Sequence, residues 1–140
     1  MKIHADPKKL DALFQKLADT LSEVLPTFWT RVVAGYFIES GTGFTHQQIF
    51  FTGVAQEDWL DLVELAFRSD EYDDAVLTAG DVFGEVHRLC AWSGDNWTGM
   101  TFTLDRDGSF CADYSYEPLT DYGRSFILQW QSRYLTEEGS

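Results

Sequence analysis

The chain has 140 residues, of which 44% are hydrophobic and 16% aromatic; this suffices for one compact core and excludes a disordered protein. Ten Lys and Arg face 23 Asp and Glu, so the net charge is −13 at pH 7, and direct binding to nucleic acid or to an anionic membrane surface is disfavoured. No apolar run approaches the roughly 20 residues that span a bilayer, and the N-terminus lacks the apolar stretch of a signal peptide. We therefore expect a cytoplasmic protein of one domain, residues 1–140.

The first predicted element is an amphipathic helix over residues 7–24. Asp6 is a good N-cap, and Pro7 suits the first helical position. Apolar residues recur at spacings of three and four and form one stripe, made of Leu10, Leu13, Phe14, Leu17, Leu21 and Val24. Pro26 ends the helix.

Two strands joined by a short turn follow, at residues 30–39 and 44–52. The first strand is rich in β-branched and aromatic residues, and the turn between them has the sequence Ser-Gly-Thr-Gly. His46 has no evident partner for catalysis or metal binding. We therefore interpret it as a residue on the solvent-facing side of the second strand.

The middle of the chain is predicted to be helical, over residues 56–67 and again over residues 72–90, because apolar residues recur at spacings of three and four. The acidic residues 70–74 are either a connection or a helix start, so the pattern leaves open whether residues 56–92 form one helix or two. Gly80 and Gly84 each weaken a helix by roughly 1 kcal/mol relative to alanine and, four residues apart, could let another backbone approach closely.

The clearest pattern in the sequence is a β-hairpin over residues 97–118. Apolar and polar residues alternate on both sides of a turn at residues 105–108, where Asp-Gly supplies the positive-φ position of a tight turn. Pro118 closes the hairpin, and the spacing of aromatic residues predicts a final helix over residues 119–135.

These elements predict an α+β fold in the order α-ββ-α(α)-ββ-α. The two hairpins would join into one four-stranded antiparallel sheet, and the helices would cover one of its faces.

The sequence shows no motif that indicates catalysis. It contains no phosphate-binding loop, no G-x-S-x-G nucleophile motif, no H-E-x-x-H and no paired cysteines, and its three histidines lie in three different elements. We interpret His87 as a cation near a helix C-terminus, and Cys90 and Cys111 as reduced, partly buried thiols. We therefore expect a protein that is not an enzyme and has no cofactor and no metal site.

Negative charge is concentrated in one part of the chain. Ten acidic residues lie between Phe51 and Glu85 and only Arg68 opposes them, whereas charges are nearly balanced over residues 1–31. Such a surface favours a basic partner, for which carboxylates imitate phosphate and neighbouring aromatic residues supply contact area. The candidate partner-binding residues are Glu57, Asp58, Asp61, Glu64, Asp70, Glu71, Asp73, Asp74, Trp92 and Asp95, and Asp113 could lie at the edge of the same surface.

Several motifs in order resemble a known family. They are Trp97-Thr-Gly-Met-Thr-Phe-Thr-Leu104, Asp107-Gly-Ser-Phe110 and Asp113-Tyr-Ser-Tyr116, with Gln129-Trp-Gln-Ser-Arg-Tyr-Leu135 similar to a W-x-Y-x-Y-L ending in which Ser132 replaces the middle aromatic residue. Leu25-Pro26 followed by Trp29 is similar to an I-P-x-x-W element. Together they resemble the YezG-like immunity (antitoxin) family of bacterial polymorphic-toxin systems.

The resemblance implies a small cytoplasmic protein that binds and neutralises a toxin domain, often a nuclease, and it implies no catalytic residues. The chain departs from the family pattern between Gly53 and Ser93, where one long acidic helix would be expected and Ser69-Asp70 splits it. We place partner specificity in that region, which leaves the identity of the toxin open.

We therefore predict an immunity protein of a polymorphic-toxin or contact-dependent growth inhibition system, which occludes the active site of a basic toxin, a nuclease above all, with an acidic surface. An acidic secretion chaperone or adaptor is the alternative, because small size, low pI and an α+β layout fit it too. A small enzyme with an Asp–His site is a third possibility. The pattern does not decide between a monomer and a homodimer.

Overall fold

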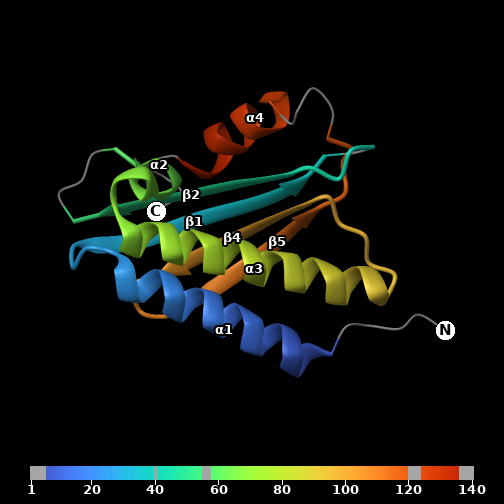
Figure 1. Ribbon diagram of the computed structural model, residues 1–140, viewed down its shortest axis with the longest axis horizontal. Helices are drawn as coiled ribbons and strands as arrows, with labels where there is room; N and C mark the ends of the chain where they lie inside the picture. Colours follow the sequence, from blue (N-terminus) through green and yellow to red (C-terminus); the bar gives the residue numbers. More distant parts are fainter. Residues whose placement is uncertain (1–5, 40, 55–57, 120–123, 136–140) are drawn as a thin grey trace.

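An antiparallel β-sheet lies between two layers of helix (Figure 1). The computed structural model describes residues 6–39, 41–54, 58–119 and 124–135. Within them the sheet has five strands in the order β3-β2-β1-β4-β5. The elements in chain order are α1 (Pro7–Val24), β1 (Trp29–Ile38), β2 (Thr45–Gly53), β3 (Leu60–Asp61), α2 (Leu62–Leu65), the 3-10 helix η1 (Ala66–Arg68), α3 (Asp70–Trp92), β4 (Gly99–Asp105), β5 (Phe110–Ser115) and α4 (Arg124–Tyr134).

The predicted α+β class is confirmed, but two predicted details are wrong. Helices cover both faces of the sheet. On the first face, Val32, Ala34 and Tyr36 of β1 belong to a core that α1 and α3 complete. On the second face, Val33 and Phe37 belong to a smaller core closed by Trp130 of α4. The expected single covered face is therefore incorrect, and the expected four strands become five because β3 adds to the edge of β2.

Helix α1 forms as the sequence predicts. The Asp6 carboxylate accepts a hydrogen bond from the Lys8 amide at 3.0 Å, and Pro7 occupies the first helical position. Leu17 and Leu21 are fully buried on the stripe that faces the sheet. In Figure 1, α1 and α3 run side by side across the first face, and they contact each other along their length.

The predicted helix over residues 56–67 is largely wrong. Leu60 and Asp61 pair with Phe51 and Phe50 as strand β3, and the Asp61 carboxylate then caps α2 by accepting from the Glu64 amide at 3.2 Å. Residue Ser69 has an extended backbone and its hydroxyl accepts from the Tyr72 amide at 3.4 Å, which starts α3 anew. Two N-caps eight residues apart thus divide this part of the chain, and residues 56–92 are not one helix.

Helix α3 crosses the first face as one long element, and its two glycines face the sheet. The Gln47 side chain lies so close to Gly80 that an added Cβ would be 2.7 Å from its amide oxygen, whereas a Cβ at Gly84 would be 3.7 Å from the Tyr36 hydroxyl. The Gln47 amide donates to the Val76 carbonyl at 3.1 Å. The groups that come close to these glycines are therefore the side chains of Gln47 and Tyr36, and not another backbone as the sequence suggested.

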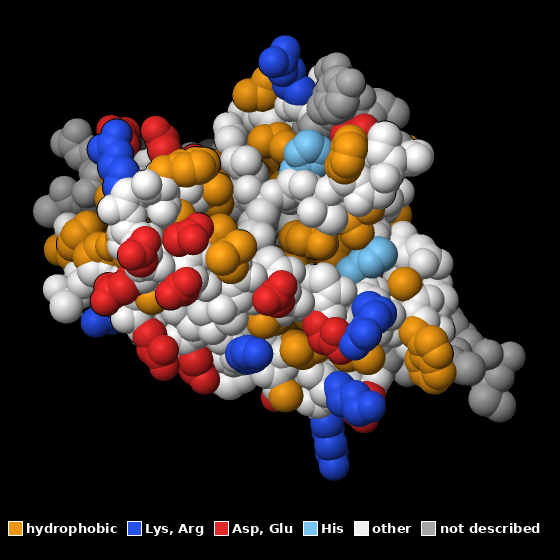
Figure 2. All heavy atoms as spheres, viewed as in Figure 1, with side chains coloured by type: hydrophobic (Ala, Val, Ile, Leu, Met, Phe, Trp, Pro, Cys, Tyr) orange, Lys and Arg blue, Asp and Glu red, His pale blue; other side chains and the backbone are white. Residues whose placement is uncertain are grey.

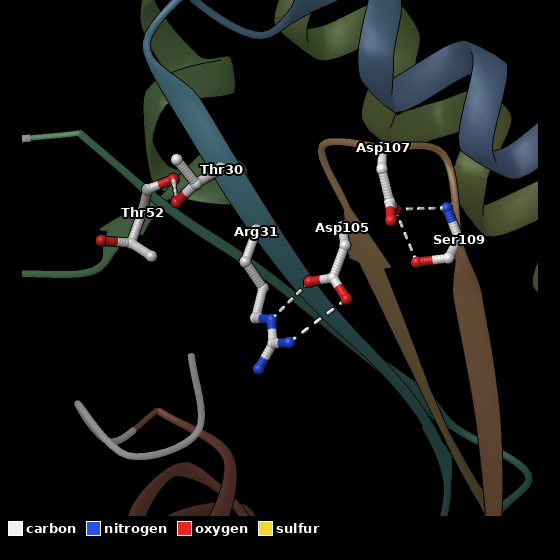
Figure 3. A network of polar contacts seen from close by, with 6 residues as sticks. All are labelled: Thr30, Arg31, Thr52, Asp105, Asp107 and Ser109. Atoms are coloured by element: carbon white, nitrogen blue, oxygen red, sulfur yellow. Dashed lines mark hydrogen bonds and ion pairs between the residues drawn. The ribbon is translucent and has the colours of Figure 1, made fainter.

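The β4–β5 hairpin confirms the strongest sequence prediction (Figure 3). Gly108 has a φ of 92°, and the Asp107 carboxylate accepts from the amide and the hydroxyl of Ser109 at 2.9 and 2.6 Å. At the same end, the Arg31 guanidinium donates to both carboxylate oxygens of Asp105, at 2.6 and 3.2 Å. These two residues are direct cross-strand partners, so the bidentate pair fixes the register of β1 and β4.

Candidate partner-binding surface

Acidic side chains gather at the N-terminal end of α3. Asp70, Glu71, Asp73 and Asp74 are all exposed in its first two turns, where carboxylates complement the positive end of the helix dipole. Figure 2 shows Asp and Glu side chains concentrated over the part of the molecule where α2, the start of α3 and the end of α1 lie. We call this region the acidic end.

A carboxylate from α1 joins the acidic end. A groove between α1 and α3 is lined by Thr20 and Glu23 from one helix and by Glu71, Asp74 and Thr78 from the other. Sequence reasoning missed Glu23, because it lies in the segment where charges are balanced and only the antiparallel packing of the two helices brings it to Glu71 and Asp74. Its position one turn from Pro26 could have indicated which end of α1 it occupies.

The other predicted acids are placed less uniformly. Asp58 and Glu64 are exposed, and α2, which carries Glu64, packs against α3. Asp61 is half-buried and its carboxylate is engaged as the cap of α2. Glu57 lies outside the described residues.

One exposed aromatic side chain stands within the acidic end. Phe67 in η1 is 88% exposed and lies between Glu64 and Asp70 in the chain. Two other aromatic residues near these acids in the sequence are not available in the same way, because Trp59 packs against the second core and Tyr72 against the first. The periodicity placed Phe67 on the buried side of a helix that does not form, which is why sequence reasoning missed it.

The structure does not bring Trp92 and Asp95 to the acidic end. Asp70 and Trp92 are the first and last residues of α3, which separates them by about 33 Å at the usual rise per residue. Trp92 is 78% exposed. Asp113 lies on β5 beside α4, in the layer of the second face. The expectation that these three residues border the acidic surface is therefore wrong, and a contact of Trp92 or Asp95 with a partner stays a prediction.

Asp95 instead takes part in the fold. Its carboxylate accepts a hydrogen bond from the Tyr116 hydroxyl at 2.6 Å. This bond to a carboxylate is the main cause that raises the pKa of Tyr116 to about 12. Burial is the main cause that raises the pKa of the neighbouring Tyr114 to about 12.

The histidines and cysteines lie in separate places. His46 is half-buried with its Nε2 3.4 Å from a carboxylate oxygen of buried Glu39, a partner that the sequence did not reveal. His87 packs edge-on against Trp97, with ring centroids 4.7 Å apart. Both cysteines are free: Cys90 is buried, which raises the pKa of its thiol, whereas Cys111 is exposed, so its expected partial burial is wrong.

In the described residues, no three His, Cys, Asp or Glu side chains are arranged so that they could hold a metal ion. None of the helices in the same ranges has the length and apolar character needed to cross a membrane.

The family model described as "Immunity protein YezG-like" matches residues 10–137. The chain belongs to this family of immunity proteins. It is similar to Immunity protein YezG of Bacillus spizizenii, with 26% identity over 117 residues that span 80% of this chain and 71% of the relative.

Proposed function

We propose that this immunity protein neutralises its toxin by placing the acidic end over a basic active site, and that the toxin is a nuclease. One observation carries the proposal: exposed carboxylates of α1 and α3 line one groove at the acidic end, and the exposed ring of Phe67 lies in the chain between exposed Glu64 and Asp70. A nuclease must present Lys or Arg to the phosphates of its substrate. Carboxylates accept charge-assisted hydrogen bonds from the same groups.

The proposed mechanism is occlusion by competition. Asp70, Asp73 and Asp74 accept hydrogen bonds that the phosphates of the substrate would otherwise accept, and the net charge of −13 speeds the encounter with a basic cleft. Phe67 supplies an apolar contact of the kind that carries much of the affinity in interfaces. The inhibitor acts in a one-to-one complex and changes no covalent bond.

We further propose that the protein works in the cytoplasm, as part of a polymorphic-toxin or contact-dependent inhibition system. Its partner is the toxin domain, and it does not bind nucleic acid or membrane itself, because its own surface carries the same sign of charge as both.

A pair of charge reversals tests the proposal. Asp74→Lys places a cation within the acidic end, whereas Asp11→Lys makes the same change of charge on α1, about 18 Å along the helix from Glu23. With the cognate toxin domain, we expect wild type and Asp11→Lys to abolish nuclease activity at a one-to-one ratio. Asp74→Lys should need at least about tenfold more protein.

Two results would contradict the proposal at different levels. If wild type binds the toxin domain and leaves its activity intact, occlusion of the active site is wrong. If Asp74→Lys and Asp11→Lys inhibit equally well, the acidic end is not the surface that meets the toxin.

A further inference from the structure

We infer that β5 offers its free edge to an extended, basic segment of the toxin, which adds a sixth strand to the sheet. This inference rests on the proposed function only in that the partner is the toxin. It concerns a surface distinct from the acidic end, on the outer strand of the sheet.

Strand β5 is an outer strand of the sheet and is long enough to pair with another strand. Among the described residues it pairs only with β4, and its six residues contain no Pro, Lys or Gly. Proteins commonly block an exposed edge by short strands, lysine or proline. The opposite edge of the sheet is less exposed. Strand β3 pairs with part of β2, and the side chains of Gln47 and Gln48 of β2 hydrogen-bond to α3 and α4.

The backbone N–H and C=O groups of β5 point alternately toward β4 and away from it. The Asp105 amide donates to the Ser109 carbonyl at 2.9 Å, so this pair is hydrogen-bonded across the hairpin. Counting on in twos, Cys111 and Asp113 also direct their N–H and C=O groups to β4. Phe110, Ala112 and Tyr114 direct theirs outward, and no backbone hydrogen bond to them from a loop occurs in the described part of the chain.

Packing against the first core fixes β5 in its extended conformation. The side chains of Phe110, Ala112 and Tyr114 are half-buried against the first core. Phe110 contacts Phe14 of α1, with ring centroids 6.1 Å apart. A strand fixed in this way loses little conformational freedom when a partner strand binds.

The charged side chains beside the β5 edge favour a basic partner. A cleft of about 350 Å³ lies between β5 and α4, and Asp113, Ser115 and Glu117 line it at every second residue. The Tyr134 hydroxyl donates a hydrogen bond to the Asp113 carboxylate at 3.4 Å. Arg133 also lines the cleft, and its guanidinium carbon lies 5.3 Å from the centroid of the Tyr134 ring. Alternate side chains of an added strand would enter this cleft, where two carboxylates oppose one cation and favour Lys or Arg.

The same charges disfavour a second copy of this chain as the occupant. Two β5 strands paired edge to edge would bring both Asp113 carboxylates onto one short stretch of one face, and each copy carries a net charge of −13. Like charges that face each other across paired strands are destabilising. A basic segment of the toxin has the complementary sign.

Amide hydrogen exchange, followed residue by residue by NMR, tests this inference. In the free protein we expect the amides of Phe110, Ala112 and Tyr114 to exchange faster than those of Cys111 and Asp113, since only the latter are bonded to β4. When the cognate toxin domain is bound, the three outward amides should exchange at least about tenfold more slowly, as hydrogen-bonded strand amides do. If they keep their free rates in a saturated complex, the inference is wrong.

A variant pair supplies an independent readout. Ala112→Pro removes one outward N–H, and proline is tolerated on an edge where that group faces solvent, whereas Ala112→Ser keeps the N–H. We expect the Kd for the toxin domain to rise about tenfold or more for Ala112→Pro and to stay within about threefold for Ala112→Ser. Equal affinities would overturn the inference, and if Ala112→Pro does not fold, the exchange experiment on wild type decides.

The inference and the proposed function can fail separately. Loss of inhibition in Asp74→Lys without protection of the β5 edge would leave the acidic end as the binding surface and remove the added strand. Protection of the β5 edge with full inhibition by Asp74→Lys would do the reverse.

Discussion

The indole N–H of Trp130 donates a hydrogen bond to the Thr101 hydroxyl at 2.8 Å, in a buried position between α4 and β4. The ring of Trp130 also lies edge-on to Phe37 of β1, with centroids 5.4 Å apart. This one side chain therefore joins α4 to two strands and closes the second core.

Loss of the Thr101 hydroxyl should be costly. Thr101→Val keeps the shape of the side chain and leaves the Trp130 N–H buried without its partner, so we expect the free energy of unfolding to fall by about 1–3 kcal/mol. Thr103→Val is the control, because Thr103 lies two residues on along the same strand and is half-buried. Urea unfolding of both variants measures the difference, and equal stabilities would contradict this role for Thr101.

The two glycines of α3 should respond differently to alanine. Gly84→Ala places a Cβ in ordinary contact with Tyr36, so better helix propensity should raise stability by about 0.5–1 kcal/mol. Gly80→Ala forces the Gln47 amide to move and weakens its bond to the Val76 carbonyl, which offsets that gain. Thermal unfolding should give a higher Tm for Gly84→Ala than for Gly80→Ala, and the reverse order would show that the packing here is different.

These elements also show how far the sequence determines the fold. Helix α1 and the β4–β5 hairpin follow from local signals, namely the Asp6–Pro7 start and the Asp107-Gly108 turn. The second covered face does not follow from local signals of this kind. The sequence of β1 nevertheless carries a signal for it, because residues 32–37 are all buried and an unbroken apolar run is typical of a strand covered on both sides. Helix α4 has no local feature that states which face it covers.

The candidate site was predictable in part for the same reason. The acids at the start of α3 lie together because they are neighbours in sequence, so charge alone located them. Glu23 and Phe67 could not be found in that way. The place of Glu23 in the site depends on the packing of α1 against α3. The exposure of Phe67 depends on Asp61 and Ser69, which divide a stretch whose periodicity fits one helix.

Phe67 should matter for binding and not for folding. Because its side chain is 88% exposed, Phe67→Ala should leave the free energy of unfolding within about 0.5 kcal/mol of wild type. The free energy of binding to the toxin domain should weaken by about 2 kcal/mol or more, as is typical when an aromatic anchor is removed from an interface. Phe44→Ala, at a 61% exposed aromatic before β2, is the control and should bind as wild type does. Calorimetric titration of both decides, and equal affinities would remove Phe67 from the interface.

The Tyr116–Asp95 bond predicts a late phenol titration. The pKa of Tyr116 is raised from its usual 10.0 to about 12, chiefly by this hydrogen bond. Absorbance at alkaline pH should therefore show Tyr116 ionising later than an exposed tyrosine, and Asp95→Asn should return it toward its usual pKa. Unchanged titration in Asp95→Asn would contradict the assigned cause.

The same pair sets the sign of a small dependence of stability on pH. A pKa that is raised in the folded state means that folding favours the neutral phenol. Its contribution is complete below pH 10 and is lost as the pH rises toward 12. Tyr116 is 59% exposed, so solvent screening keeps this contribution small, and Asp95→Asn should flatten the alkaline limb slightly.

The ionic-strength dependence of the association rate tests the central claim most directly, namely that the acidic end meets a basic surface of the toxin. Stopped-flow measurements with wild type, Asp74→Lys and Asp11→Lys from about 0.01 to 0.5 M salt cover Debye lengths from about 30 Å to below 8 Å. We predict a rate constant that falls steeply with salt for wild type and Asp11→Lys, and a lower, flatter dependence for Asp74→Lys. A wild-type rate that does not change with salt, or the same slope for all three proteins, would contradict the account.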